Sequence, residues 1–109
     1  SKTVSYDQEN DILVIHKGFS LDEKFKSNID LGDLILDVST KGKVVGIEII
    51  NAIKFFKEFD IDYETLKDIT DAEFSATMQP NSIIIGIKIK SKGSEMPAKI
   101  AVPLRTSMR

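Results

Sequence analysis

The chain contains no cysteine and no tryptophan, and only one of its 109 residues is a histidine. Without cysteine there can be no disulfide, no thiolate nucleophile and no cysteine-ligated metal. One histidine cannot build a histidine-rich metal site within a single chain. No apolar run approaches the roughly 20 residues of a membrane-spanning helix. We therefore expect no metal, no cofactor and no contact with a membrane.

Hydrophobic residues form 41% of the chain and charged residues 29%, which is typical of a soluble globular protein and not of a disordered one. The length predicts a single domain over residues 1–109. Because Ser1 to Tyr6 contain no apolar signal region, we expect a cytoplasmic protein.

The clearest strand of the first half is residues 12–17, which pairs with residues 4–6 across a polar turn. Apolar side chains lie on both faces of this strand, so we expect both faces to be covered, either by helices of this chain or by a second subunit. Farther along, residues 25–29 form a short strand or, alternatively, residues 21–25 form one helical turn.

A second hairpin joins Leu34–Val38 to Val44–Ile50, with Gly42 at a positive φ in the turn between them. The cross-strand pairs that this turn implies are Ile35–Ile47, Asp37–Val45, Leu34–Glu48 and Leu36–Gly46. This register puts Asp37 and Glu48 on opposite faces of the hairpin.

Residues 52–69 predict two short helices. Asn51 is a good N-cap for the first helix, because its side-chain oxygen can accept from a free backbone N–H. One face of that helix is apolar at helical spacing: Ala52, Phe55, Phe56 and Phe59. Asp60 or Asp62 caps the second helix.

The last third returns to strands, because apolar and polar residues alternate in 72–79 and 83–89 on either side of Pro80-Asn81. A two-residue loop pairs apolar with apolar side chains on one face and opposite charges on the other. The implied pairs are Phe74–Ile87, Ala76–Ile85, Met78–Ile83, Glu73–Lys88 and Asp71–Lys90. We expect a polar loop over 91–97 and a final strand over 98–104.

These elements predict an α+β fold, in which antiparallel β-hairpins form one or two sheets packed by one or two short helices inserted between the halves. A weak internal duplication would relate residues 1–50 to 71–104, with the helices of 52–69 between them.

His16, Asp37 and Glu48 are the candidate functional residues. His16 is the side chain whose ordinary pKa lies nearest neutral pH. Asp37 and Glu48, with the neighbouring Asp30 and Asp33, could bind a hard cation or do acid–base work. We favour a structural role for all of them, since the predicted register separates Asp37 from Glu48. We assign no catalytic, cofactor-binding or metal-binding residue.

Residues 80–109 carry 6 basic side chains and 1 acidic one, whereas residues 1–79 carry 9 basic and 16 acidic. The basic residues of this region are Lys88, Lys90, Lys92, Lys99, Arg105 and Arg109. Sheets that bind nucleic acid combine such residues with exposed aromatics, but no aromatic residue follows Phe74. A nucleic-acid accessory protein therefore stays an alternative, and nucleic acid is not the partner we expect.

The first half of the chain resembles a known family. The similar segments are Ser5-Tyr6-Asp7, Asp11 to Ile15, Leu36-Asp37-Val38 and Lys41 to Ala52, with Ile50 where the family usually has Leu. Over roughly residues 4–56 the chain resembles the prokaryotic and archaeal domain of unknown function 2283 family. The resemblance implies a small cytoplasmic α+β domain, and it transfers no catalytic residue.

Our leading hypothesis is a non-catalytic protein-interaction or oligomerising module. Its partner would be a second copy, as in a dimer, or a small partner protein. A different class of function stays open, namely a small-ligand-binding domain or a hydrolase-like enzyme that uses the acidic cluster.

Overall fold

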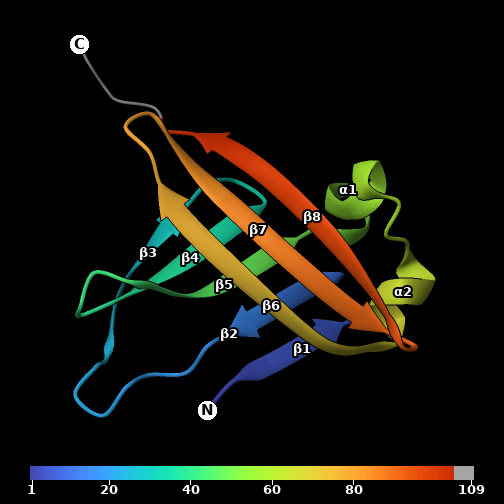
Figure 1. Cartoon of the computed structure of the whole chain (residues 1–109), viewed down its shortest axis with the longest axis horizontal. Coiled ribbons are helices and arrows are strands. Elements are labelled where there is room, and N and C mark those ends of the chain that lie inside the picture. Colours follow the sequence, from blue (N-terminus) through green and yellow to red (C-terminus); the bar gives the residue numbers. More distant parts are fainter. Residues whose placement is uncertain (105–109) are drawn as a thin grey trace.

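The computed structural model describes residues 1–104, which form two antiparallel sheets and a few short helices (Figure 1). The strands are β1 (Thr3–Asp7), β2 (Ile12–His16), β3 (Phe25–Asp30), β4 (Leu34–Ser39), β5 (Val44–Ile50), β6 (Ile69–Met78), β7 (Ser82–Ser91) and β8 (Ser94–Pro103). The helices are α1 (Ala52–Phe56), the 3-10 turn η1 (Lys57–Phe59) and α2 (Tyr63–Lys67). The chain is thus α+β, with strand predominating over helix.

The first sheet has five strands in the order β1-β2-β5-β4-β3. Both predicted hairpins of the first half are present, and residues 25–30 form a strand and not a helical turn. Gly42 has the expected positive φ of 74°.

The predicted register of the β4–β5 hairpin is wrong beyond the turn. Val38 pairs with Val44 as expected, but a bulge then shifts the ladder, so that Asp37 faces Gly46 and Leu36 faces Ile47. A bulge places one extra residue on one strand, and this register lets Leu36 and Ile47 enter the core together. The sequence offers no sign of a bulge here, because Val45 is as apolar as its neighbours.

The second sheet has three strands in the order β6-β7-β8. All five predicted β6–β7 pairs are present. The expected polar loop over 91–97 is wrong, because β8 already begins at Ser94 and the turn is only Lys92-Gly93, with φ of 51° and 79°. Two consecutive positive φ values are typical of the type I′ turn that joins tightly twisted strands.

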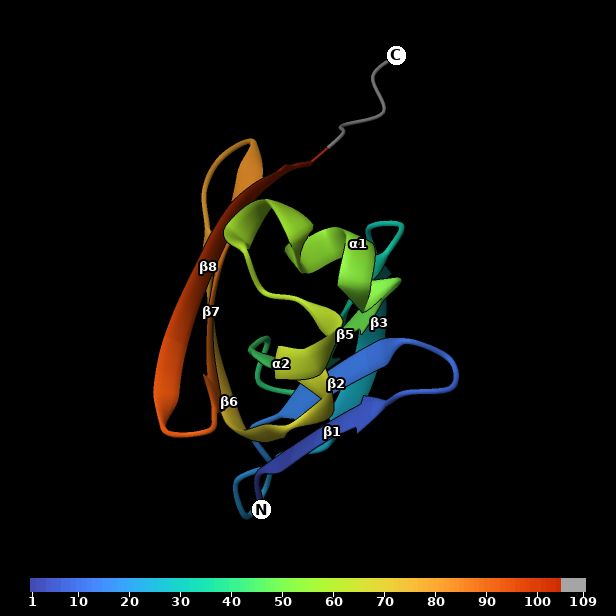
Figure 2. The same ribbon diagram turned by 90° about the vertical axis from the view of Figure 1, so that its right-hand side faces the viewer.

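The two sheets bury their inner faces in one common core. Its buried members are Leu13, Ile15, Leu34, Leu36, Ile47, Ile49, Ala52, Phe56, Ile61, Leu66, Ala72, Phe74, Ile83, Ile85, Ile87, Ile89 and Ala98. In Figure 2 the three-stranded sheet is seen edge-on, and α1 and α2 lie on the side of it that faces the first sheet. No helix among residues 1–104 is long and apolar enough to cross a membrane.

Candidate functional site

The outer face of the first sheet is the side turned away from the second sheet, and it carries all three candidate residues. His16 and Asp37 are the cross-strand neighbours of Gly46, and Glu48 lies two residues farther along β5. The prediction that Asp37 and Glu48 lie on opposite faces is therefore wrong, and the β4–β5 bulge is the reason. The structure therefore places His16, Asp37 and Glu48 on neighbouring strands, on the same face of the first sheet.

His16 and Asp37 close over Gly46 from its two sides. A Cβ built on Gly46 would lie 2.6 Å from His16 Cδ2 and 3.0 Å from Asp37 Oδ2. The His16 Nδ1 atom accepts a 2.8 Å hydrogen bond from the backbone N–H of Gly18, and its ring packs edge-on against Phe19 at 5.0 Å between centroids. With Nδ1 engaged as an acceptor, the hydrogen of the neutral ring sits on Nε2.

The two carboxylates of this face have different surroundings. Asp37 Oδ1 accepts from the side-chain amide of Asn28 on β3 at 2.5 Å. Glu48 lies between the apolar side chains of Val14 and Ile35, its cross-strand neighbours. Among residues 1–104, no three His, Asp or Glu side chains gather closely enough to hold a metal ion.

The rest of the acidic cluster serves local structure. Asp30 Oδ1 accepts from the backbone N–H of Gly32 at 2.9 Å, which closes the β3–β4 turn. Asp33 Oδ1 accepts from the Asn51 side chain at 3.3 Å. Asp30 and Asp33 therefore each bond to a group other than Glu48.

Four apolar side chains also lie on the outer face, flanked by polar side chains of β1 and β3 such as Ser5 and Asn28. Ile12, Val14, Ile35 and Ile50 are half-buried. Ile12 pairs with Ile50, and Val14 and Ile35 flank Glu48. Figure 2 shows no helix or strand of residues 1–104 on this side of the first sheet. The second sheet covers only the inner face of β2. The cover expected for its other face is therefore not supplied by the described part of the chain.

The lysines of the last third lie on the outer face and at one turn of the second sheet. Lys90 pairs with Glu95 at 3.4 Å and Lys92 with Asp68 at 3.0 Å. Lys88 and Lys99 border a shallow hollow of about 380 Å³ over Gly86. Arg105 and Arg109 lie outside the described residues. The nucleic-acid alternative stays a prediction.

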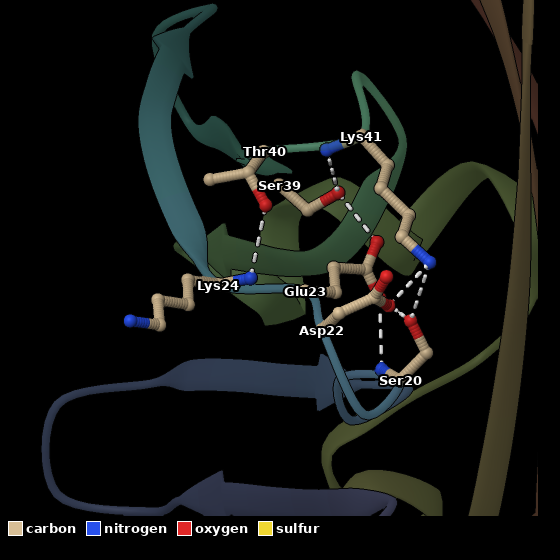
Figure 3. A network of polar contacts seen from close by, with 7 residues as sticks. All are labelled: Ser20, Asp22, Glu23, Lys24, Ser39, Thr40 and Lys41. Atoms are coloured by element: carbon tan, nitrogen blue, oxygen red, sulfur yellow. Dashed lines mark hydrogen bonds and ion pairs between the residues drawn. The ribbon is translucent and has the colours of Figure 1, made fainter.

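A buried polar network, centred on Glu23, was not singled out by the sequence analysis (Figure 3). Its carboxylate accepts from the backbone N–H of Ser20 at 2.9 Å and from the Ser39 hydroxyl at 2.5 Å. These two bonds, the first above all, lower the pKa of Glu23. Lys41 in the β4–β5 turn reaches Asp22 at 2.8 Å. The network ties the β2–β3 loop to the β4–β5 turn.

The spacing Ser20-x-x-Glu23 was the available signal for this network. It is the spacing of a capping box, in which a glutamate accepts from the backbone N–H three residues earlier. Here the same bond forms in a turn that does not continue into a helix. Its function is structural, because each named oxygen has a protein partner.

A second clamp joins the β1–β2 hairpin to the start of α1. Asp11 accepts from the Tyr6 hydroxyl at 2.7 Å and from the backbone N–H of Ile53 at 3.2 Å. The backbone carbonyl of Asp11 also accepts from the N–H of Ala52 at 3.1 Å. Burial, followed by the bond to Asp11, raises the pKa of the Tyr6 hydroxyl.

Asn51 does not cap α1 as its sequence position predicts. It has left-handed backbone angles and its side chain makes no capping bond. Asp11, 42 residues away from Ile53, supplies the acceptor in its place. The expected cap of α2 is confirmed, because Asp62 accepts from the N–H of Thr65.

The chain is similar to a family and to an archaeal protein. Residues 3–52 match the model of the family described as "Protein of unknown function (DUF2283)". The "Uncharacterized protein MJ0789" of Methanocaldococcus jannaschii is 37% identical over 87 residues, which cover 79% of this chain and 70% of that protein. The chain belongs to the DUF2283 family. No solved structure matches it.

The DUF2283 match covers the whole first sheet and ends at Ala52, the first residue of α1. It includes the Tyr6–Asp11 clamp and the complete outer face. The similarity to the archaeal protein extends farther, because a continuous stretch of 79% of this chain must reach into β7 wherever it begins. β6 and the beginning of β7 therefore belong to what the two proteins share. Neither comparison indicates a catalytic or other specific function.

Proposed function

We propose that this DUF2283 protein is a non-catalytic protein-interaction or oligomerising module whose contact surface is the outer face of the first sheet. One observation carries the proposal: Ile12, Val14, Ile35 and Ile50 form an apolar patch that no element of residues 1–104 covers. Apolar patches rimmed by polar residues are typical of surfaces that bind other proteins. His16, Asp37 and Glu48 form the polar part of this surface.

The outer-face patch suits protein contact better than chemistry. Asp37 is held by Asn28, and one nitrogen of His16 is held by the backbone of Gly18. A protein partner needs apolar area with polar residues beside it, and this sheet face provides both, with Glu48 between Val14 and Ile35. The partner is a second copy or a small protein.

Val14→Lys tests the proposed function, because it replaces an apolar side chain of the patch, next to Glu48, with a long charged one. The wild-type chain is expected to sediment as a complex, and the variant as a single chain. Thr77→Lys, at an exposed position on the outer face of the second sheet, is the matched control and should behave as wild type. A wild-type monomer that binds no protein partner at high concentration would contradict the proposal.

We also propose a single cytoplasmic domain in which the helices of 52–69 act as packing elements inserted between the two halves. The common core of both sheets supports this arrangement. The weak duplication that would relate residues 1–50 to residues 71–104 remains a prediction. The two segments form sheets of different size, with five and three strands.

A second candidate function has one observation in its favour. Asp37 and Glu48 share a face, so both carboxylates could contact one small ligand or act as the acid–base pair of a hydrolase-like enzyme. Asp37→Asn with Glu48→Gln would then abolish binding of a ligand retained in native mass spectra. An unchanged retained mass would exclude this use of the pair.

A further inference from the structure

Exposed apolar side chains gather at the two ends of the molecule. In Figure 1 the loop between β2 and β3 and the turn between β4 and β5 lie at one end, and α1 and α2 lie at the opposite end. Residues 1–104 contain six large hydrophobic side chains that are exposed, and five of them lie at these two ends. They are Phe19, Leu21 and Phe25 at one end and Ile53 and Tyr63 at the other, with Met78 on the second sheet. Such grouping is typical of contact surfaces, whereas single exposed apolar residues are ordinary.

The first of these ends, the loop end, consists of residues 17–26, which lead from β2 into β3, and residues 40–43 of the β4–β5 turn. The backbone N–H of Thr40 donates to the carbonyl of Lys24 at 2.8 Å, and the buried polar network adds further bonds between the two segments (Figure 3). Leu21 lies in a turn of this loop and its side chain is fully exposed. The loop end therefore holds a leucine in the solvent on a well-braced support.

The loop end is basic, although the whole chain has a net charge of −2. Its two segments contain five lysines and two acidic residues. One of the acidic residues, Glu23, is buried, and the other, Asp22, pairs with Lys41 at 2.8 Å. Lys24 and Lys26 are exposed and form no ion pair with a carboxylate of residues 1–104. Positive charge therefore accompanies the exposed leucine.

The opposite end of the molecule, the helix end, is acidic. It consists of residues 7–11 in the β1–β2 turn and residues 53–64 of the helical segment, which are joined where the Tyr63 hydroxyl donates to the side chain of Gln8 at 3.1 Å. These two segments contain seven acidic residues and two lysines. A hollow of about 450 Å³ opens in the helical segment, lined by Ile53, Lys57, Asp60, Ile61 and Asp62.

The lining of this hollow combines apolar surface with negative charge. Ile61 is buried and Ile53 is 41% exposed, so the two isoleucines offer apolar contact to a side chain that enters. Asp60 and Asp62 are exposed, and Lys57 is the one basic residue of the lining. The hollow therefore suits an apolar side chain that arrives with positive charge beside it. The loop end carries such a side chain, but it lies at the opposite end of its own chain and cannot reach the hollow.

We propose that the loop end of one copy docks on the helix end of the next, with Leu21 seated in the hollow against Ile53 and Ile61. Lys24 and Lys26 then approach the acidic side chains of the helix end, which orients the two copies. The partner is a second copy because both complementary surfaces belong to this chain. The two surfaces differ, so the contact is heterologous and repeats into a row or a ring of copies. The inference goes beyond the proposed function, since it uses the ends of the molecule and not the outer face of the first sheet.

The contact between the two ends is expected to be weak. It buries one leucine and a few exposed charges, far less than the roughly 1,600 Å² of a standard interface, so we expect a dissociation constant on the order of 10⁻⁴ M. At micromolar concentration, where Val14→Lys tests the outer face, this contact is dissociated. It forms in concentrated solutions of the protein.

Mixing two complementary variants tests the inference with the full chain. All chains carry Val14→Lys, so that the proposed contact of the outer face is absent. Leu21→Glu removes the leucine of the loop end, and Ile53→Lys places a positive charge in the hollow. Each variant alone should associate at least about tenfold more weakly than the Val14→Lys parent in sedimentation equilibrium.

An equimolar mixture of the two variants should form a one-to-one complex with the affinity of the parent contact and no larger species. Each variant keeps the surface that the other has lost, so one intact contact remains in the mixture. Recovery also requires that both variants are folded. A mixture that associates no better than the separate variants would overturn the inference.

Isotopic labelling of one variant at a time maps the contact in the same mixture. When the Leu21→Glu chain is labelled, its amide resonances should shift within residues 53–64. When the Ile53→Lys chain is labelled, the shifts should fall within residues 17–26. Shifts in the strands of the outer face, or in the same segment of both chains, would contradict a contact between unlike ends.

Met78→Glu is the matched control for Leu21→Glu, because Met78 is 62% exposed but lies on the second sheet. This variant should associate as the parent does. Raising the ionic strength from about 0.1 M to about 1 M shortens the Debye length from about 10 Å to about 3 Å, and should weaken the contact severalfold. A loss at Met78→Glu equal to that at Leu21→Glu, or an association that salt leaves unchanged, would count against the inference.

This inference and the proposed function can fail separately. If Val14→Lys disrupts the wild-type complex and leaves a monomer near millimolar concentration, the outer face is the interface and the inference is wrong. If Val14→Lys leaves self-association unchanged and Leu21→Glu weakens it, the ends form the contact and the outer face does not bind a second copy. If the wild-type chain binds another protein but not itself, the inference alone is wrong. If it binds neither, both are wrong.

Discussion

Asp11 and Asn51 have nearly the same left-handed backbone, with φ of 56° and 55°, but only Asp11 caps α1. Replacing either by Gly changes the backbone in the same way, because Gly adopts positive φ without strain. We expect Asp11→Gly to lower the free energy of unfolding by about 1–2 kcal/mol more than Asn51→Gly, since it removes the bonds to Ile53 and Tyr6.

Urea unfolding followed by circular dichroism measures this difference. Tyr6→Phe, which removes one of the same bonds, should produce a smaller loss in the same direction. Equal losses for the two Gly variants would show that Asp11 does not act as the remote cap.

Gly46 is the residue that allows His16 and Asp37 to approach each other. A methyl group at this position would lie 2.6 Å from His16 Cδ2, which is closer than real contacts permit. We expect Gly46→Ala to destabilise the fold by about 1–3 kcal/mol through overpacking. In a His16→Ala background the same substitution should cost much less, and a thermal unfolding cycle of the four proteins measures the coupling. Additive losses would contradict this account of the glycine.

At the scale of elements, Glu23 is the tether between the β2–β3 loop and the β4–β5 turn. Its pKa is lowered in the folded state, so the ionised carboxylate stabilises the fold. This stabilisation is fully present above the ordinary glutamate pKa of about 4.3 and is lost as the pH falls through the lower folded value. We therefore expect the stability difference between wild type and Glu23→Gln to be constant near neutral pH and to shrink below about pH 4.3.

Chemical denaturation at a series of pH values measures the Glu23 effect. Glu9→Gln, the same exchange at an exposed turn position, is the matched control for the loss of a glutamate charge. A Glu23→Gln difference that stays the same down to pH 3 would show that the charge of the carboxylate does not matter to the tether.

Alternation of apolar residues was enough to predict most elements and the β6–β7 register from Asp71 to Met78, because one buried face specifies a register strongly. The alternation did not predict the β4–β5 register, because a single extra residue at the bulge near Val45 shifts the cross-strand pairs. That bulge moved Asp37 to the face of Glu48, so the candidate site depended on a feature that periodicity does not encode. The Asp11 cap was missed for a related reason, since its partner at Ile53 is distant in sequence.

At the scale of the whole molecule, the two sheets share one core, although the family match covers only the first. Ile85 at the centre of β7 is fully buried in that core, and Ile85→Ala should cost about 2–5 kcal/mol. If the chain folds as one domain, the first sheet must lose the same stability against unfolding, because neither sheet can stay folded with its inner face exposed.

Native-state hydrogen exchange, compared between the backbone amides of β5 and those of β7, measures this coupling. We expect Ile85→Ala to speed exchange in both strands by the same factor, corresponding to the global loss of stability. Thr77→Ala, on the exposed face of the same sheet, should leave both strands nearly unchanged. If exchange quickens in β7 while β5 keeps its wild-type protection, the first sheet is stable without the second, and the boundary of the family match at Ala52 is also a boundary of folding.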